Sequence, residues 1–302
     1  RQLSLEMHAD ALNLQGQWVL GLLLFSTVLL VVGITNILPN VVPGAMCGTG
    51  VIQAMGDSGG RALLFRLLSL AILFVWLTVC QINAAKPYGP LTQTGARLLL
   101  VALPAYFPAL YETFAAVLHV NIEQPVSCCA IVYDQFRSLQ EARSPAGLPD
   151  RLWLVGFLVG AGVLMFTAML TFRAETPIKR PKRIFLVVTS AFWIPVAAVT
   201  LVHHLAAYHY GVLQHHCPWC LFLSQYRMVG YPLFGALIVV AFETIVILWL
   251  PQLSWPAAEI GVVVDQRIRK ASLRIFASIV VFLLLSALPA LYWRLRYGVW
   301  LS

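Results

Sequence analysis

The hydrophobic and polar positions divide this chain into long apolar stretches separated by short polar connections. A membrane-spanning helix needs about 20 apolar residues to cross about 30 Å of hydrocarbon. Seven stretches meet that length, at residues 18–38, 62–83, 98–120, 152–172, 184–208, 229–250 and 275–293. They predict an all-α, polytopic membrane bundle of about seven transmembrane helices. No small-residue cleavage site precedes the first stretch, so we expect a retained helix rather than a removed signal peptide.

Composition supports the same interpretation and excludes several classes of protein. The 302 residues are 60% hydrophobic and only 11% charged, with a mean hydropathy of +0.82. Soluble domains are about 45–50% apolar and about 25% charged, so a soluble enzyme and a disordered chain are excluded. The expected surroundings are a lipid bilayer. The net charge of +8 does not indicate nucleic acid, because basic residues of membrane proteins collect in cytoplasmic loops.

The placement of the basic residues predicts the orientation. Twelve of the 20 Lys and Arg residues, including all four lysines, lie at Arg1 or in connections 84–97, 173–183 and 251–274. The bias is sharpest in the short 173–183 connection, where the positive-inside rule is strongest. We therefore expect the N-terminus inside and the C-terminus outside, in a cell inner (plasma) membrane. The chain divides into an N-terminal segment 1–97, a four-helix core 98–250 and a C-terminal part 251–302.

This orientation places most of the potentially reactive side chains on the outer side. The expected outer residues include five of the six cysteines and most of the histidines: Cys47, Cys128, Cys129, Cys217, Cys220, His119, His203, His204, His209, His215 and His216. Disulfides form and persist on the oxidising side of a membrane. Cysteines and histidines gathered at one membrane surface indicate redox chemistry or a metal. Gly48 and Gly50 next to Cys47 are typical of a tight turn.

The most informative motif is Cys217-Pro-Trp-Cys220. Two cysteines separated by two residues can close a small disulfide ring. If the pair opens a helix, the helix N-terminus stabilises a thiolate, and a charged His216 adds to that effect. The same pair also suits half of a zinc site with His215 or His216.

Cys217-Pro-Trp-Cys-Leu-Phe-Leu-Ser224, at the start of an apolar helix, resembles the active-site helix of the vitamin K epoxide reductase family. It is more loosely similar to the DsbB-like disulfide-forming proteins. The resemblance implies a four-helix core over residues 98–250 around a quinone, with Cys217 and Cys220 as the active pair. It places Cys128 and Cys129 where the family has its shuttle pair, although that pair is not adjacent in the family.

A few polar residues inside or beside the spans are candidates for a role near a quinone. Arg227 corresponds loosely to a quinone-proximal arginine, and Trp219 is an aromatic ring for stacking. Glu112 and Glu243 lie inside spans, where a carboxylate is costly and normally faces the bundle interior. Either glutamate suits proton transfer coupled to quinone chemistry, and a purely structural hydrogen bond is the alternative. Of the two, Glu112 is nearer the outer side.

Three functions follow from these features. The first is a thiol–disulfide oxidoreductase that passes electrons between an external dithiol protein and a membrane quinone. The second is a membrane subunit of an electron-transfer complex that holds b-type haem or a metal through four histidines: His119, His203, His204 and His216. The third is a non-catalytic anchor or assembly subunit whose cysteines form structural disulfides.

Overall fold

The fold is known from a computed structural model, which describes residues 2–85, 89–126, 149–175, 177–212, 215–253 and 260–300. Within these ranges the chain is helical and contains no strand. The all-α prediction is therefore confirmed for the described residues. Cys128 and Cys129 lie outside them.

In the part of the chain that the structure describes, seven helices are long and apolar enough to cross a membrane, as predicted. They cover Asn13–Asn40, Asp57–Ala84, Thr92–Leu118, Arg151–Phe172, Arg180–Tyr210, Gly230–Leu253 and Gly261–Tyr297. The corresponding α-helices are α1 (Gln2–Val32), α3 (Asp57–Ala84), α4 (Thr92–Leu118), α6 (Asp150–Phe172), α7 (Arg180–Thr200), α9 (Gly230–Leu253) and α10 (Gly261–Tyr297). These apolar segments are suited to lipid, where no water is present to hydrogen-bond the backbone. A helix meets that condition because it satisfies its backbone hydrogen bonds internally.

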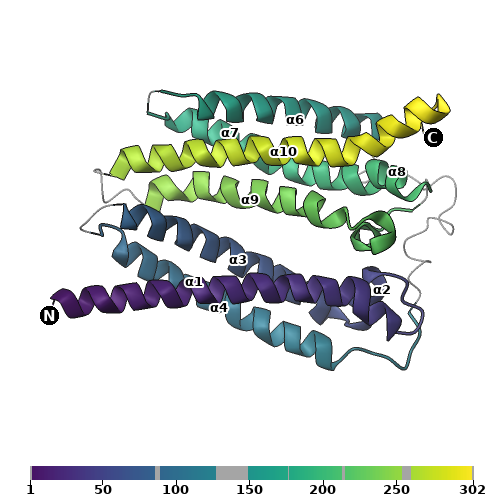
Figure 1. Ribbon diagram of the computed structural model, residues 1–302, viewed down its shortest axis with the longest axis horizontal. Helices are drawn as coiled ribbons and strands as arrows, with labels where there is room; N and C mark the ends of the chain where they lie inside the picture. The colour runs from purple at the N-terminus through teal and green to yellow at the C-terminus, as the bar shows by residue number, and fades with distance from the viewer. Residues whose placement is uncertain are drawn as a thin grey trace.

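The helices form two packed groups rather than one core over residues 98–250 (Figure 1). Helices α6, α7, α9 and α10 pack around the aromatic side chains of Phe157, Trp193 and Phe282, whose ring centroids lie 5.6–6.0 Å apart. Helix α4 packs mainly against α3, and α1 also packs on α3. The four-helix bundle therefore includes α10 and excludes α4. This grouping could not be inferred from chain order.

A buried ion-pair network joins the two groups. Glu243 of α9 is 1% exposed and accepts hydrogen bonds from Arg267 and Arg274 of α10, each at 2.7 Å. Arg267 also donates to Thr78 of α3 at 3.4 Å. These contacts account for the early start of α10, which begins at Gly261 rather than near residue 275. Most of the predicted 251–274 connection is therefore helix, and Glu243 is held by two cations.

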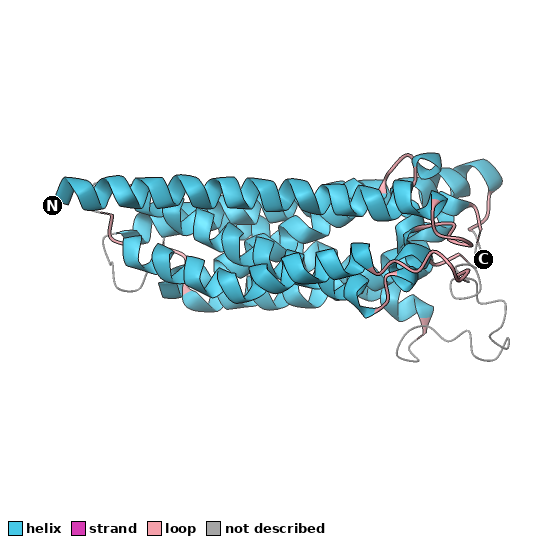
Figure 2. Cartoon of the chain, turned by 90° about the horizontal axis from the view of Figure 1, so that it is seen from below, coloured by secondary structure: helices cyan, strands magenta, loops and turns pink. Residues whose placement is uncertain are grey.

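The two ends of the bundle differ in structure. The N-terminus lies at one end, and the C-terminus lies at the other (Figure 1). The short elements lie at the end opposite the N-terminus, seen again in the second view (Figure 2). They are α2 (Gly48–Ala54), the π-helical turn Leu201–Leu205, α8 (Ala206–Tyr210) and the 3₁₀ turns Pro218–Phe222 and Ser224–Tyr226. We call this end the cysteine end, because it carries Cys47, Cys217 and Cys220.

Candidate functional site: a buried three-cysteine cluster

The first wall of the site is the loop that leads into α2. Cys47 has an extended backbone, and its carbonyl accepts the N–H groups of Gly50 and Val51 to begin the helix. Gly48 packs closely against the Trp219 ring. A Cβ added at this position would lie only 2.9 Å from that ring and 3.1 Å from Ile34, so the contact requires glycine. Gly48 and Gly50 thus belong to a helix rather than to the predicted tight turn. The close approach brings Cys47 toward residues 217–220.

The second wall is the Cys-Pro-Trp-Cys segment, which folds as a short 3₁₀ turn, Pro218–Phe222. A 3₁₀ helix has three residues per turn, so Cys217 and Cys220 fall on the same side. The Tyr210 hydroxyl donates to the Cys217 carbonyl at 2.5 Å and fixes the start of the turn. The prediction that this motif opens the next membrane helix is wrong, since α9 begins only at Gly230. A left-handed turn at Arg227 and Met228 separates the two elements.

The three thiols meet in one buried cluster. Cys47, Cys217 and Cys220 are 2%, 1% and 6% exposed, and their sulfur atoms all lie within 4.8 Å of one another. Cys47 Sγ lies 3.4 Å from Cys217 Sγ, and the Thr49 hydroxyl lies 3.0 Å from the same Cys217 sulfur. The Cys217 sulfur therefore contacts both Cys47 and Thr49.

The thiols differ sharply in acidity. Hydrogen bonds from Cys220 and Cys47, together with the Thr49 hydroxyl, hold the pKa of Cys217 well below its usual range, despite burial. Hydrogen bonds to Cys217 and to Cys47, followed by burial, raise the pKa of Cys220. Cys217 is the thiolate of the cluster, and Cys220 keeps its proton. The main causes are thiol and hydroxyl donors, with a smaller contribution from the Cys220 backbone N–H at the start of the 3₁₀ turn.

This asymmetry predicts an unusual pH profile for Cys217. A thiol with a pKa of about 8.5 loses thiolate, and thus reactivity, about tenfold per pH unit below that value. Because its pKa is lowered, Cys217 stays deprotonated, and its alkylation rate should change little between about pH 8 and pH 5. Thr49→Val removes one donor and should move the inflection to higher pH, whereas Thr49→Ser should not. Mass spectrometry of labelled Cys217 measures both. A tenfold loss per pH unit in wild type would contradict the assignment.

Aromatic rings surround the cluster and continue to the start of α9. Tyr210, Trp219 and Tyr226 pack against the cysteines. Phe222, which follows Cys220, contacts the rings of Trp219, Tyr231 and Phe234 with centroids 4.9–5.7 Å apart. The predicted role of Trp219 as a ring beside the chemistry is compatible with this position, and no contact with a cofactor is shown.

A glycine variant tests how Cys47 is positioned. In Gly48→Ala, the new methyl group overlaps the Trp219 ring, so α2 must shift away from residues 217–220. Overpacking of this kind costs about 1–3 kcal/mol. We expect oxidative cross-linking of Cys47 to Cys217 to slow severalfold, measured by peptide mapping under non-reducing conditions. Gly60→Ala on α3 is the control, because a Cβ there meets no atom within 4 Å. Equal cross-linking in both variants would show that Gly48 does not set the approach.

The predicted histidine set is only partly brought together. The rings of His203 and His216 lie 5.2 Å apart, and His204 is adjacent to His203 in the π-helical turn. His119 is exposed at the end of α4, which belongs to the other helix group. Among the described residues, the three cysteines lie close enough together to bind one metal ion as a group. No histidine belongs to this group in the described part of the chain.

The remaining predicted residues occupy other surroundings. Arg227 is exposed in the left-handed turn. Glu112 of α4 pairs with Arg61 of α3 at 3.0 Å, so it contributes to packing between these helices. Val126 donates its N–H to the Pro43 carbonyl. It therefore connects the chain just before Cys128 and Cys129 to the loop of Cys47.

Sequence reasoning missed three members of the site: Cys47, Thr49 and Tyr210. Cys47 was placed on the correct side, yet it lies 170 residues before Cys217 and belongs to no motif. The available signal was the small-residue run Gly48-Thr49-Gly50 beside a cysteine, which permits close approach of a backbone. Comparisons of this chain with protein-family models, with curated proteins and with solved structures found no match.

Proposed function

We propose that this protein is a membrane thiol–disulfide oxidoreductase in which Cys217 is the exchanging sulfur. The observation that carries the proposal is the cluster itself. One buried thiolate contacts a second thiol from a distant loop, and a third lies one 3₁₀ turn away. Stabilisation of the thiolate also stabilises the reduced form, which makes the corresponding disulfide a stronger oxidant.

The exchange is proposed to run through a disulfide of Cys217 with Cys220 or Cys47. A thiolate of an external dithiol protein attacks the partner sulfur of that disulfide, and Cys217 leaves as the thiolate because its pKa is lowest. The second thiol of the external protein then loses its proton and displaces the partner cysteine from the mixed disulfide. The external protein ends with a disulfide, and this chain ends with two reduced cysteines.

The acceptor that returns the cluster to the disulfide is proposed to be a membrane quinone, as a second substrate. Two electrons pass from the two cysteines to the quinone, one proton comes from the partner thiol and the second from water, which yields the disulfide and the hydroquinone. The contacts among Trp219, Phe222 and Tyr231 support this choice, because they place stacking surfaces beside Cys220. We place the cysteine end on the outer side of a cell inner membrane, as the basic connections predict.

The experiment is a coupled turnover assay on purified full-length protein in detergent. A peptide with two cysteines serves as donor, and decylubiquinone serves as acceptor, with quinone reduction followed by absorbance. We expect peptide oxidation and quinone loss in a one-to-one ratio, in excess of the rate without protein. Peptide oxidation without quinone loss would support thiol exchange and show that the quinone is not the electron acceptor. If neither the peptide is oxidised nor the quinone is reduced, the proposal is wrong.

The same three sulfurs favour a second candidate, the binding of a soft metal ion. Metal–sulfur bonds of about 2.3 Å place three ligand sulfurs about 3.9 Å apart, which suits a cluster of this size. Its ligands are the three cysteines rather than the histidines of the sequence-based prediction. Zinc and copper analysis of the protein as isolated separates the two functions. One metal per chain, lost in Cys47→Ala, would favour the metal site over exchange.

A further inference from the structure

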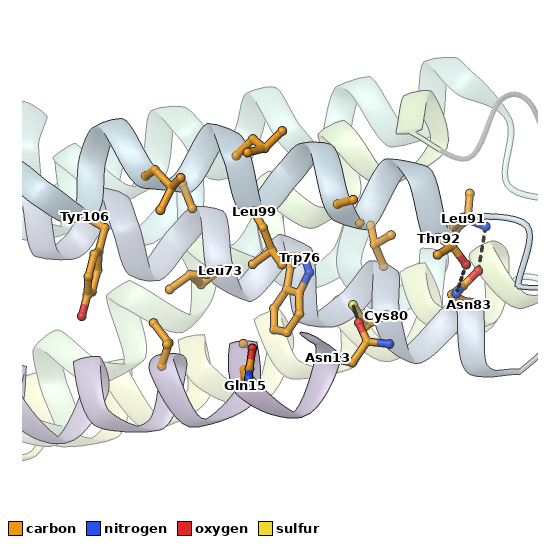
Figure 3. Close-up of a pocket in the computed structure, with 18 residues that line it drawn as sticks. Asn13, Gln15, Leu73, Trp76, Cys80, Asn83, Leu91, Thr92, Leu99 and Tyr106 are labelled. Atoms are coloured by element: carbon orange, nitrogen blue, oxygen red, sulfur yellow. Dashed lines mark hydrogen bonds between the residues drawn. The ribbon is translucent and has the colours of Figure 1, made fainter. Parts of the chain in front are cut away.

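A second site is indicated at the other end of the molecule, between α1, α3 and α4. A cavity of about 520 Å³ lies there, within the 300–1,000 Å³ that small-molecule sites usually occupy (Figure 3). Its walls are largely apolar, with Leu73, Val79 and Leu99 among them. Asp57, at the start of α3, lies near the cysteine end. Because a helix rises 1.5 Å per residue, Trp76 lies about 28 Å farther along α3. The cavity is therefore separate from the cluster.

Trp76 is the feature that suggests an occupant. Its side chain is fully buried and forms part of the cavity wall, and Gly16 of α1 packs directly on its ring. Within the part of the chain that the structure describes, its indole Nε1–H donates to no acceptor. A buried N–H without an acceptor is costly, and most such groups in proteins are satisfied by a partner. An acceptor oxygen on a bound molecule would supply that partner.

The remaining walls limit the chemistry of the occupant. Leu100 and Leu103 line the cavity and are also exposed on the lipid-facing side of α4, so a molecule can enter from the membrane. Asn83 and Thr92 lie together at one end of the cavity, joined by a hydrogen bond of 3.1 Å (Figure 3). No charged side chain lines the cavity within the described residues. The occupant should therefore be uncharged where it is enclosed.

We propose that this cavity binds a lipid-soluble molecule that presents a carbonyl oxygen to the Trp76 indole N–H. Isoprenoid quinones and the ester groups of glycerolipids both have this chemistry. The site is independent of the proposed exchange at Cys217.

The test compares two probes that differ in the carbonyl group. Decylubiquinone carries acceptor oxygens, and decylbenzene has a similar tail and ring without them. Binding to the purified full-length protein is measured by equilibrium dialysis in detergent. Trp76→Phe keeps an aromatic ring and removes the N–H, so decylubiquinone should bind about three- to tenfold more weakly. Decylbenzene should bind wild type and the variant equally, which shows that the cavity is intact.

Two further variants complete the test. Trp153→Phe is the matched control, because the Trp153 Nε1–H also has no acceptor within the described chain but does not line the cavity. Ala96→Phe fills the cavity and should weaken the binding of both probes. Equal decylubiquinone binding by wild type, Trp76→Phe and Ala96→Phe would overturn the proposal. Cys217→Ser should bind as wild type does, so failure of thiol exchange leaves this result unaffected.

Organic extraction of the purified protein followed by mass spectrometry identifies the natural source. A quinone retained by wild type and depleted in Trp76→Phe assigns the site to quinones. A glycerolipid with the same pattern assigns it to lipid esters. Retention of any such molecule that is equal in wild type, Trp76→Phe and Ala96→Phe would count against the site.

Discussion

Cys217→Ser should abolish turnover of the two-cysteine peptide, by about a thousandfold or more, because it removes the low-pKa sulfur that leaves as the thiolate. A serine hydroxyl does not form a disulfide and is not ionised near neutral pH, so no alternative path remains through this position. The coupled assay with decylubiquinone measures the loss. Thermal unfolding of the same preparation establishes that the variant is folded.

The other cysteines should give distinct results in the same assay. Cys220→Ser leaves the Cys217 thiolate in place but removes one of its two possible disulfide partners, so exchange should continue only through a Cys47–Cys217 disulfide, with Cys47 as the only cysteine that forms the mixed disulfide with the peptide, as peptide mapping under non-reducing conditions can show. Cys47→Ala removes a hydrogen-bond donor to Cys217, so its activity should fall most at low pH. Met46→Leu removes an exposed sulfur beside the cluster and should act as wild type does. If Cys217→Ser retains full turnover, the role of the cysteines is structural rather than catalytic.

Glu243→Gln should destabilise the folded protein by about 3–5 kcal/mol, because it leaves the buried charge of Arg267 without its counter-ion. The Glu243 side chain is 1% exposed and that of Arg267 is 9% exposed, so water does not replace the lost pairing. The same pairing holds α9 to α10, and the Arg267–Thr78 contact joins both to α3. The free energy of unfolding, measured by titration with a denaturing detergent, should therefore fall for both helix groups together.

Two controls separate the buried pair from charge in general. Arg274 pairs with the same carboxylate, but its side chain is 53% exposed, so Arg274→Gln should cost about 1 kcal/mol or less. The double variant Glu243→Leu, Arg267→Met removes both buried charges and should recover most of the stability lost in Glu243→Gln. If Arg274→Gln costs as much as Glu243→Gln, the stability does not depend on the burial of the pair.

The presence and number of the spanning helices were readable from the chain because lipid imposes a simple rule. Every spanning segment must satisfy its own backbone, and about 20 apolar residues are needed to cross. All seven predicted stretches are therefore present. The start of α10 was missed, because Arg267 and Arg274 resemble a polar connection until their partner Glu243 is known. An ion pair between two helices leaves no local pattern in either helix.

The candidate site was half predictable for a similar reason. Cys217 and Cys220 form a local motif, and the basic connections placed Cys47 on the same side of the membrane. The tertiary structure alone brings Cys47 to 3.4 Å from Cys217, through the packing of Gly48 on Trp219. It also shows a 3₁₀ turn where the motif suggested the start of a membrane helix, so thiol donors, more than the backbone N–H of the turn, lower the Cys217 pKa.

By itself, the sequence determined that this chain is a seven-helix membrane protein with a cysteine pair beside one end of the bundle. Those properties depend on composition and on the spacing of residues that are near each other in the chain, and both can be read from a short segment. The tertiary structure decided which helices pack together, which third cysteine joins the pair and where a cavity lies. Those properties depend on contacts between residues far apart in the chain, such as Cys47 with Cys217 and Gly16 with Trp76. In an almost uniformly apolar sequence, many helix pairings bury similar surfaces, so only the packed structure distinguishes them.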